Sequence, residues 1–151
     1  MKTQDLISYI EAGRLNDKLL DIYIDESLIA YQTDRYIRAI KSYEDTFRST
    51  PGYNDDVCII NAPGRTEIGG NHTDHQHGHV LTASINLDII AIVAKNSEMI
   101  NVRSEGYDNI ISFSSEDTAI NKNEQGTSLA MIKGVLAGAK MNGFEIGGFD
   151  A

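Results

Sequence analysis

The stretch from Ala62 to Thr82 reads APGRTEIGGNHTDHQHGHVLT and lies between two apolar runs. It contains all four histidines of the chain, together with several glycines and one aspartate. The residues alone allow three interpretations, which are a metal site, a hydrolytic site and a polar turn that is rich in glycine for backbone reasons. The helices and strands predicted on either side of the stretch indicate the fold to which it belongs.

The metal and hydrolytic interpretations both lack partners in the sequence. Neutral imidazole is a common metal ligand, and Asp74 adds a carboxylate. However, the spacing of His75, His77 and His79 is not that of a known metal site. No cysteine contributes, and the chain has no histidine elsewhere to complete tetrahedral coordination. A G-x-S-x-G nucleophile motif is absent, and the carboxylate pair of Glu67 and Asp74 is of a kind that any acidic chain offers. We therefore expect no metal at this stretch.

Helices are predicted before the stretch. Thr3 can cap a first helix that Gly13 ends, and a second helical segment runs roughly from Asn16 to Tyr31. A third helix follows Thr33, and the turn at residues 49–52 ends it. The third helix presents one apolar face, made of Tyr36, Ile40, Tyr43 and Phe47.

Strands are predicted around and after the stretch. Residues 57–60 form a short apolar run typical of a buried strand, which Pro63-Gly64 breaks, and Cys58 within it reads as a reduced core thiol. Residues 85–94 read as a long strand, and residues 100–103 and 111–113 as two short strands near an edge, joined by a turn. A helix over residues 127–142 and the start of a strand at GFDA follow. The long strand has Ile85, Leu87, Ile89, Ala91 and Val93 on one face, with Asn86 and Asp88 on the other.

These elements predict an α+β fold, in which helices pack on a mixed sheet of four or five strands. The 151 residues, with 41% hydrophobic residues, are enough for one domain with its own core. The formal net charge of −9 argues against nucleic-acid binding, which needs a basic face. No signal peptide or membrane-spanning run is present, so the predicted location is the cytoplasm.

The stretch also resembles the galactokinase signature of the GHMP kinases, A-P-G-R-[VI]-N-L-I-G-E-H-T-D-Y-N-x-G-x-V-[LF]-P. A further resemblance lies in residues 132–135, which are similar to the Y-V-K-G-V of family members. The resemblance covers about residues 34–151, whereas residues 1–33 match nothing recognisable. The signature positions that match are Ala62, Pro63, Gly64, Arg65, Gly70, His72, Thr73, Asp74, Gly78, Val80 and Leu81.

The resemblance implies a domain organisation. Residues 34–151 are expected to form the N-terminal domain of a galactokinase-like kinase, preceded by a helical extension over residues 1–33. The G-x-G-L-S-S-S-A phosphate loop of the family and its later catalytic aspartate do not occur in these residues. We therefore expect a chain truncated before the phosphate loop, inactive as a kinase by itself and prone to self-association through an uncovered sheet.

The resemblance also implies site residues. Arg65 matches the arginine near the reacting hydroxyl and is the expected catalytic residue. His72 and Asp74 match sugar-contacting positions, where hydroxyl groups need donors and acceptors in fixed directions. The family places a glutamate at the position of Asn71 and an asparagine at that of Glu67, so the two residue types are exchanged. All four are expected to bind the sugar.

A function follows from the same resemblance. Family members transfer the γ-phosphoryl group of ATP to the anomeric hydroxyl of galactose, so galactose or a related sugar, ATP and Mg²⁺ are implied for the full-length parent. No cofactor is expected to stay tightly bound to this chain. No residue is assigned to cofactor binding, because Ser128, Ala130 and Met131 stand where the family often has W-x-N-Y-V, with aromatic residues close to the adenine. The alternative is a non-catalytic sugar-binding or regulatory relative.

Overall fold

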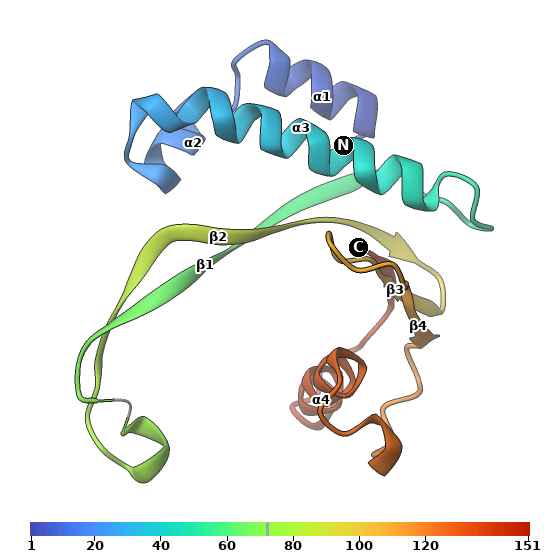
Figure 1. Cartoon of the computed structure of the whole chain (residues 1–151). Helices are drawn as coiled ribbons and strands as arrows, with labels where there is room; N and C mark the ends of the chain where they lie inside the picture. Colours follow the sequence, from blue (N-terminus) through green and yellow to red (C-terminus); the bar gives the residue numbers. More distant parts are fainter. Residues whose placement is uncertain (72) are drawn as a thin grey trace. The chain divides into compact units, whose positions relative to one another are not determined.

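The computed structural model describes residues 1–71 and 73–151, and of Asp74 only the backbone. Its elements form an α+β fold with one mixed sheet, which confirms the predicted fold class (Figure 1). The sheet order is β1-β2-β5-β3-β4, and an α-helix begins near the N-terminus. The elements are α1 (Thr3–Glu11), α2 (Asn16–Tyr23), η1 (Glu26–Leu28), α3 (Ile29–Phe47), β1 (Val57–Gly69), η2 (Asp74–Gln76), β2 (Leu81–Asn96), β3 (Met99–Val102), β4 (Ile111–Ser114), η3 (Lys122–Glu124), α4 (Ser128–Met141) and β5 (Gly148–Asp150).

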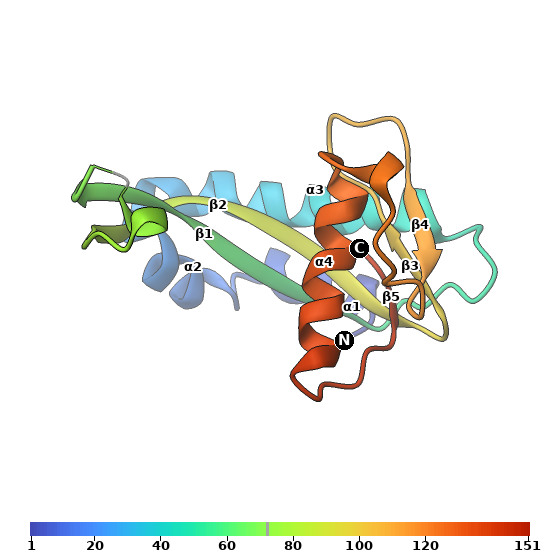
Figure 2. The same cartoon turned by 90° about the horizontal axis from the view of Figure 1, so that it is seen from below.

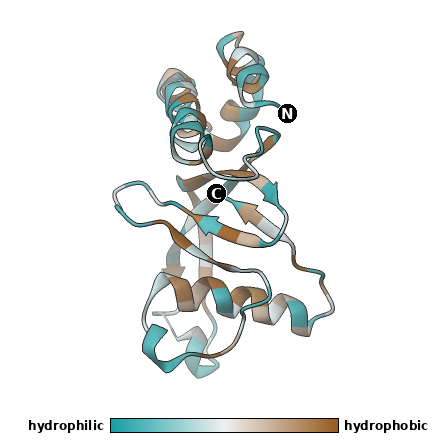
Figure 3. Ribbon diagram, turned by 90° about the vertical axis from the view of Figure 1, so that its right-hand side faces the viewer, coloured by the Kyte–Doolittle hydropathy of each residue, from teal (hydrophilic) through white to brown (hydrophobic). Residues whose placement is uncertain are grey.

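The chain divides into two compact units, which are described separately. The helical unit comprises residues 3–42 and 59–92, and the sheet unit comprises residues 1–2, 43–58 and 93–151. In the helical unit, α1, α2 and most of α3 lie next to one another and carry both hydrophilic and hydrophobic residues (Figure 3). Their apolar sides contribute to the core of this unit, which includes Ile10, Leu19, Tyr23, Tyr36 and Ile40.

The second predicted helix is shorter than expected. It was predicted to run to Tyr31, but α2 ends at Tyr23 because Ile24 adopts a left-handed conformation with φ of 61°. The Asp25 carboxylate then accepts a hydrogen bond from the backbone N–H of Ser27 at 2.9 Å, which starts a new turn. As a result α3 begins at Ile29, earlier than predicted.

The sheet unit is organised around the hairpin of β3 and β4. The two strands are antiparallel, with Ile100 opposite Phe113, and β5 pairs in parallel with β3 and antiparallel with the end of β2. Leu136 of α4 packs on Ile100 and Phe113, and Thr127 caps this helix through the backbone N–H of Ala130. The helix predicted at 127–142, the strands predicted at 100–103 and 111–113, and the strand predicted to begin at GFDA are present as α4, β3, β4 and β5.

Two predictions for β1 are wrong. Pro63-Gly64 was expected to break the strand, yet β1 continues to Gly69 (Figures 1 and 2). Because β1 is the first strand in the sheet order, proline can sit here on its free side, where no N–H is needed. Cys58 was expected in the core, but it is an exposed free thiol, since it alternates with the buried Val57.

The alternation of β2 is present, but the face with the larger apolar residues is not the covered one. Leu87 and Ile89 are 71% and 75% exposed. On the opposite face the side chain of Asp88 is only 3% exposed, and Ile92 is buried. Asp88 on the covered face belongs to a buried polar cluster, which is described below.

Candidate functional site

Arg65 and Glu67 lie on the same face of β1, because they are two residues apart in a strand. Arg65 is exposed and Glu67 is half-buried. Between the two lies Thr66, and before them Gly64 approaches β2 closely. A Cβ atom at Gly64 would lie 3.0 Å from the carbonyl oxygen of Leu87 and 3.3 Å from the side chain of Ile85. Gly64 therefore allows β1 to lie close to β2 next to Arg65 and Glu67.

The loop from Gly70 to Val80 turns sharply at its start. Gly70 has a φ of 109°, and a Cβ atom there would lie 2.5 Å from the carbonyl oxygen of His79 and 2.6 Å from Cα of Val80. Only glycine suits both the conformation and the close approach. The next residue, Asn71, also has a positive φ, of 55°, which asparagine tolerates better than most residues. The two ends of the loop are therefore held together at Gly70.

Thr73 organises the inside of this loop. Its hydroxyl group donates to the carbonyl oxygen of Gly70 at 2.8 Å. Its own carbonyl oxygen accepts hydrogen bonds from the backbone N–H groups of Gln76 and Gly78, at 3.0 and 2.8 Å. A Cβ atom at Gly78 would collide with the Thr73 side chain. The match of Thr73 and Gly78 to the signature thus has a structural reason, which is the shape of the loop.

The predicted site residues are spread over the strand and the loop. Arg65 and Glu67 stand on β1, and Asn71 stands at the beginning of the loop. His72 and the side chain of Asp74 lie outside the described residues, so the roles assigned to all five stay predictions.

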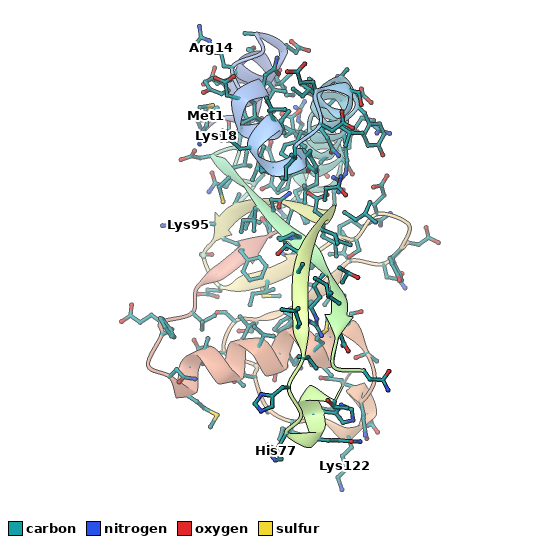
Figure 4. The ribbon with its side chains drawn as sticks, turned by 90° about the vertical axis from the view of Figure 1, so that its left-hand side faces the viewer. Met1, Arg14, Lys18, His77, Lys95 and Lys122 are labelled. Carbon is teal, nitrogen blue, oxygen red and sulfur yellow. The ribbon has the colours of Figure 1, made fainter. Side chains whose placement is uncertain are left out.

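The remaining histidines are exposed, and His77 is labelled at the tip of the loop (Figure 4). Within the described part of the chain, no group of three His, Cys, Asp or Glu side chains is placed to hold a metal ion.

A buried polar cluster around Asp88 was missed by sequence reasoning. The Asp88 carboxylate accepts hydrogen bonds from Tyr23 of α2 at 2.6 Å, from Arg35 of α3 at 2.5 Å and from the side-chain amide of Asn61 on β1. Arg35 also donates to the carbonyl oxygen of Asp88 at 3.0 Å, and the hydroxyl groups of Tyr23 and Tyr36 lie 3.3 Å apart. The sequence signal was a lone aspartate at a polar position of a strand, which usually faces solvent.

The cluster changes the acid–base behaviour of its members. Burial, and then the hydrogen bond to Asp88, raise the pKa of the Tyr23 hydroxyl well above its ordinary value. For Arg35, burial acts to lower the pKa, but the hydrogen bond and charge of Asp88 outweigh this and raise it. Both groups therefore keep their protons, and Asp88 accepts hydrogen bonds from three different side chains.

The sheet unit contains a cavity of about 790 Å³ beside α4, lined by residues of 118–137. Lys133 is buried at this cavity and its ammonium group bonds Asp117 at 2.8 Å and Glu124 at 3.1 Å. These bonds, with Asp117 first, raise the pKa of Lys133, and the same contact lowers the pKa of Asp117. Ser128, Ala130 and Met131 line the same cavity.

Comparison with known proteins matches β1 and the loop that follows it to a known signature. A family model described as the galactokinase galactose-binding signature matches residues 43–95. The chain carries the galactose-binding signature of the galactokinase family. The galactokinase of Pyrococcus furiosus is 32% identical over 89 residues, which are 59% of this chain and 24% of that relative. The predicted resemblance to an N-terminal portion of this family is therefore confirmed, and the match spans about a quarter of the relative's length.

Proposed function

We propose that this chain is the sugar-binding part of a kinase that transfers the γ-phosphoryl group of ATP to the anomeric hydroxyl of galactose or a related sugar. The observation that carries the proposal is the signature region itself. It places Arg65 on the same face of β1 as Glu67 and leads directly into the tightly turned loop that begins at Gly70. In this proposal residues 34–151 are the N-terminal domain of the kinase, and residues 1–33 are a helical extension.

Arg65 is proposed as the catalytic residue. Its guanidinium group is exposed on β1 and so is accessible to a ligand. Beside the reacting hydroxyl it would offset the negative charge that develops during phosphoryl transfer. Loss of such a group typically costs about 3 kcal/mol in the transition state.

Four residues are proposed to bind the sugar. Carboxylates such as Glu67 and Asp74 accept hydrogen bonds from hydroxyl groups, whereas Asn71 and His72 can both donate and accept. The exchange of glutamate and asparagine between positions 67 and 71 would keep one acceptor and one amide at the pocket.

ATP and Mg²⁺ are proposed as the cosubstrate and metal of the full-length protein. The cavity beside α4 has apolar walls from Ala130 and Met131, which suit an aromatic base. Asp117 and Glu124 are already bonded to Lys133 and bring negative charge, which does not suit phosphate groups. The phosphates would therefore be held elsewhere. When bound, the metal would neutralise charge on the transferring phosphate.

Three further properties belong to this proposal. None of the helices in the described part of the chain is long and apolar enough to cross a membrane, and a cytoplasmic location remains our proposal. Self-association is also proposed, because Ile68, Leu87 and Ile89 are exposed on β1 and β2. We further propose that these 151 residues have no kinase activity alone, which an assay of ADP release with galactose and ATP tests.

A non-catalytic sugar-binding relative is the second candidate. Three replacements favour it, because Asn71 stands where the family has a glutamate, and Ser128 and Met131 stand where it has aromatic residues. Both candidates predict sugar binding, and they differ only in phosphoryl transfer. The full-length protein therefore discriminates them, since only the kinase consumes ATP when galactose is added.

Calorimetry tests the sugar site directly. Galactose is titrated into the chain and into its Asp74→Asn variant, with Asp34→Asn as the control that makes the same charge change on the exposed face of α3. We expect galactose to bind, Asp74→Asn to weaken binding by about tenfold or more and Asp34→Asn to leave it unchanged. Absence of any galactose binding to the chain, or equal binding by both variants, overturns the proposed site.

A further inference from the structure

The Asp88 carboxylate connects three elements of the helical unit. Its side chain is 3% exposed and is bonded by Tyr23 from α2, Arg35 from α3 and Asn61 from β1. Removing a carboxylate from water is costly unless every lone pair finds a donor. Separating the partners of a buried ion pair leaves an uncompensated charge, so such a pair disfavours arrangements in which the elements that it joins lie apart. Such a group is expected to fix geometry.

The geometry that it fixes is the register of the signature strand. Asn61 lies on β1 four residues before Arg65, and its amide group is bonded to Asp88 on β2. A second close contact between β1 and β2 lies nearby, where Gly64 approaches the carbonyl oxygen of Leu87. Because side chains alternate in a strand, a slip by one residue would turn Arg65 and Glu67 to the opposite face.

The partners of Asp88 also bring the N-terminal helices into this arrangement. Tyr23 belongs to the first 33 residues, which lie before the matched signature, and its hydroxyl group donates to Asp88 at 2.6 Å. Gln32 accepts a hydrogen bond from Arg35 at 3.1 Å, which orients the guanidinium group. The helices therefore hold the carboxylate from one side while Asn61 holds it from the strand.

We propose that Asp88 is a positioning residue for sugar binding, which acts through Asn61 to keep Arg65 and Glu67 facing the sugar. In this view α2 and α3 belong to the binding apparatus, and residues 1–33 are more than an extension. The inference rests on the proposed function, because it assumes that β1 contributes to a galactose site. It adds a role for residues that do not touch the sugar.

The test compares three variants of the 151-residue chain. Asp88→Asn removes the charge. Asn61→Ala removes the amide that links β1 to Asp88 and to the hydroxyl groups of Tyr23 and Tyr36, while the pair of Arg35 and Asp88 stays. Asp34→Asn is the control, because its carboxylate is exposed and pairs with Arg38 on the helix surface. Nitrogen-15 NMR spectra report the backbone amides of residues 65–70, calorimetry reports galactose affinity, and circular dichroism reports folding.

We expect Asn61→Ala and Asp88→Asn to shift the amides of residues 65–70 and to weaken galactose binding by about tenfold, with folding retained and the control unchanged. If Asp88→Asn does not fold, Asn61→Ala alone decides. Unchanged amides and an affinity within about twofold of the original in Asn61→Ala overturn the inference. If the unmodified chain does not bind galactose, the proposed function fails, and the amide shifts still decide whether Asp88 positions the strand.

Discussion

Arg35 on α3 and Asp88 on β2 are joined at 2.5 Å, although 53 residues separate them in the sequence. A second bond from the same guanidinium group reaches the backbone carbonyl oxygen of Asp88 at 3.0 Å. The pair therefore fixes both the side chain and the strand that carries it. Asp88 lies on the covered face of β2, whereas Leu87 and Ile89 lie on its exposed face.

Arg35→Ala is expected to destabilise the helical unit strongly. It leaves the buried Asp88 carboxylate without its counter-charge, which typically costs about 3 kcal/mol. Urea unfolding followed by circular dichroism measures the change in the free energy of unfolding. Arg38→Ala is the matched control on the same helix, because its pair with Asp34 is more than half exposed on both sides and is worth about 0.5 kcal/mol. Equal losses in the two variants would contradict the prediction.

Stability at alkaline pH should depend on Tyr23. Burial and the bond to Asp88 raise its pKa in the folded state above the ordinary value of 10.0, so folding favours the protonated form. This contribution is complete below about pH 10 and is lost as the pH rises further, because only the unfolded chain then releases the proton easily. Tyr23→Phe should therefore fall less steeply in unfolding free energy above about pH 10. A slope identical to that of the unmodified chain would count against this.

Stability at acidic pH should depend on Asp117. Its hydrogen bond to Lys133 lowers its pKa in the folded state below the ordinary value of 3.8. The contribution is therefore present above about pH 4 and is lost as the pH falls through the lowered pKa. Asp117→Asn should flatten the acid side of a plot of unfolding free energy against pH. The prediction fails if the slope is unchanged.

Substitution of two neighbouring glycines should have opposite outcomes. Gly70→Ala introduces a Cβ atom 2.5 Å from a backbone oxygen, at a φ of 109°, and should distort the loop. Gly69→Ala meets nothing within 4 Å and is the control. We expect Gly70→Ala to weaken galactose binding by about tenfold and Gly69→Ala to leave it within about twofold, as measured by calorimetry. If both variants bind alike, the loop does not need this turn.

Much of the fold could be predicted because periodicity and capping are local. The buried face of α3 follows from Tyr36, Ile40, Tyr43 and Phe47, which are all nearly inaccessible to solvent. The end of α4 follows from its glycine stop. In contrast, the end of α2 at Tyr23 depends on the left-handed Ile24, a conformation that no sequence rule assigns to isoleucine.

Of the candidate site, only the residues within the signature could be predicted from the sequence. The residues of the strand and loop could be assigned by resemblance, since they are contiguous in the sequence. The cluster around Asp88 could not, because its donors come from α2, α3 and β1, and only the tertiary fold brings them together. The exposure of Leu87 likewise depends on which face of β2 the helices cover.

The position of β5 has a consequence for how the protein is made. Residues 148–150 form the strand between β2 and β3, so these two earlier strands are joined in the sheet only through β5. During synthesis the ribosome completes β3, β4 and α4 before it supplies this strand, and insertion of a strand into a sheet requires contacts distant in sequence, which form slowly. Before β5 is made, the edges of β2 and β3 that it will pair with carry unpaired backbone N–H and C=O groups, which leaves residues 93–147 open to non-native strand pairing.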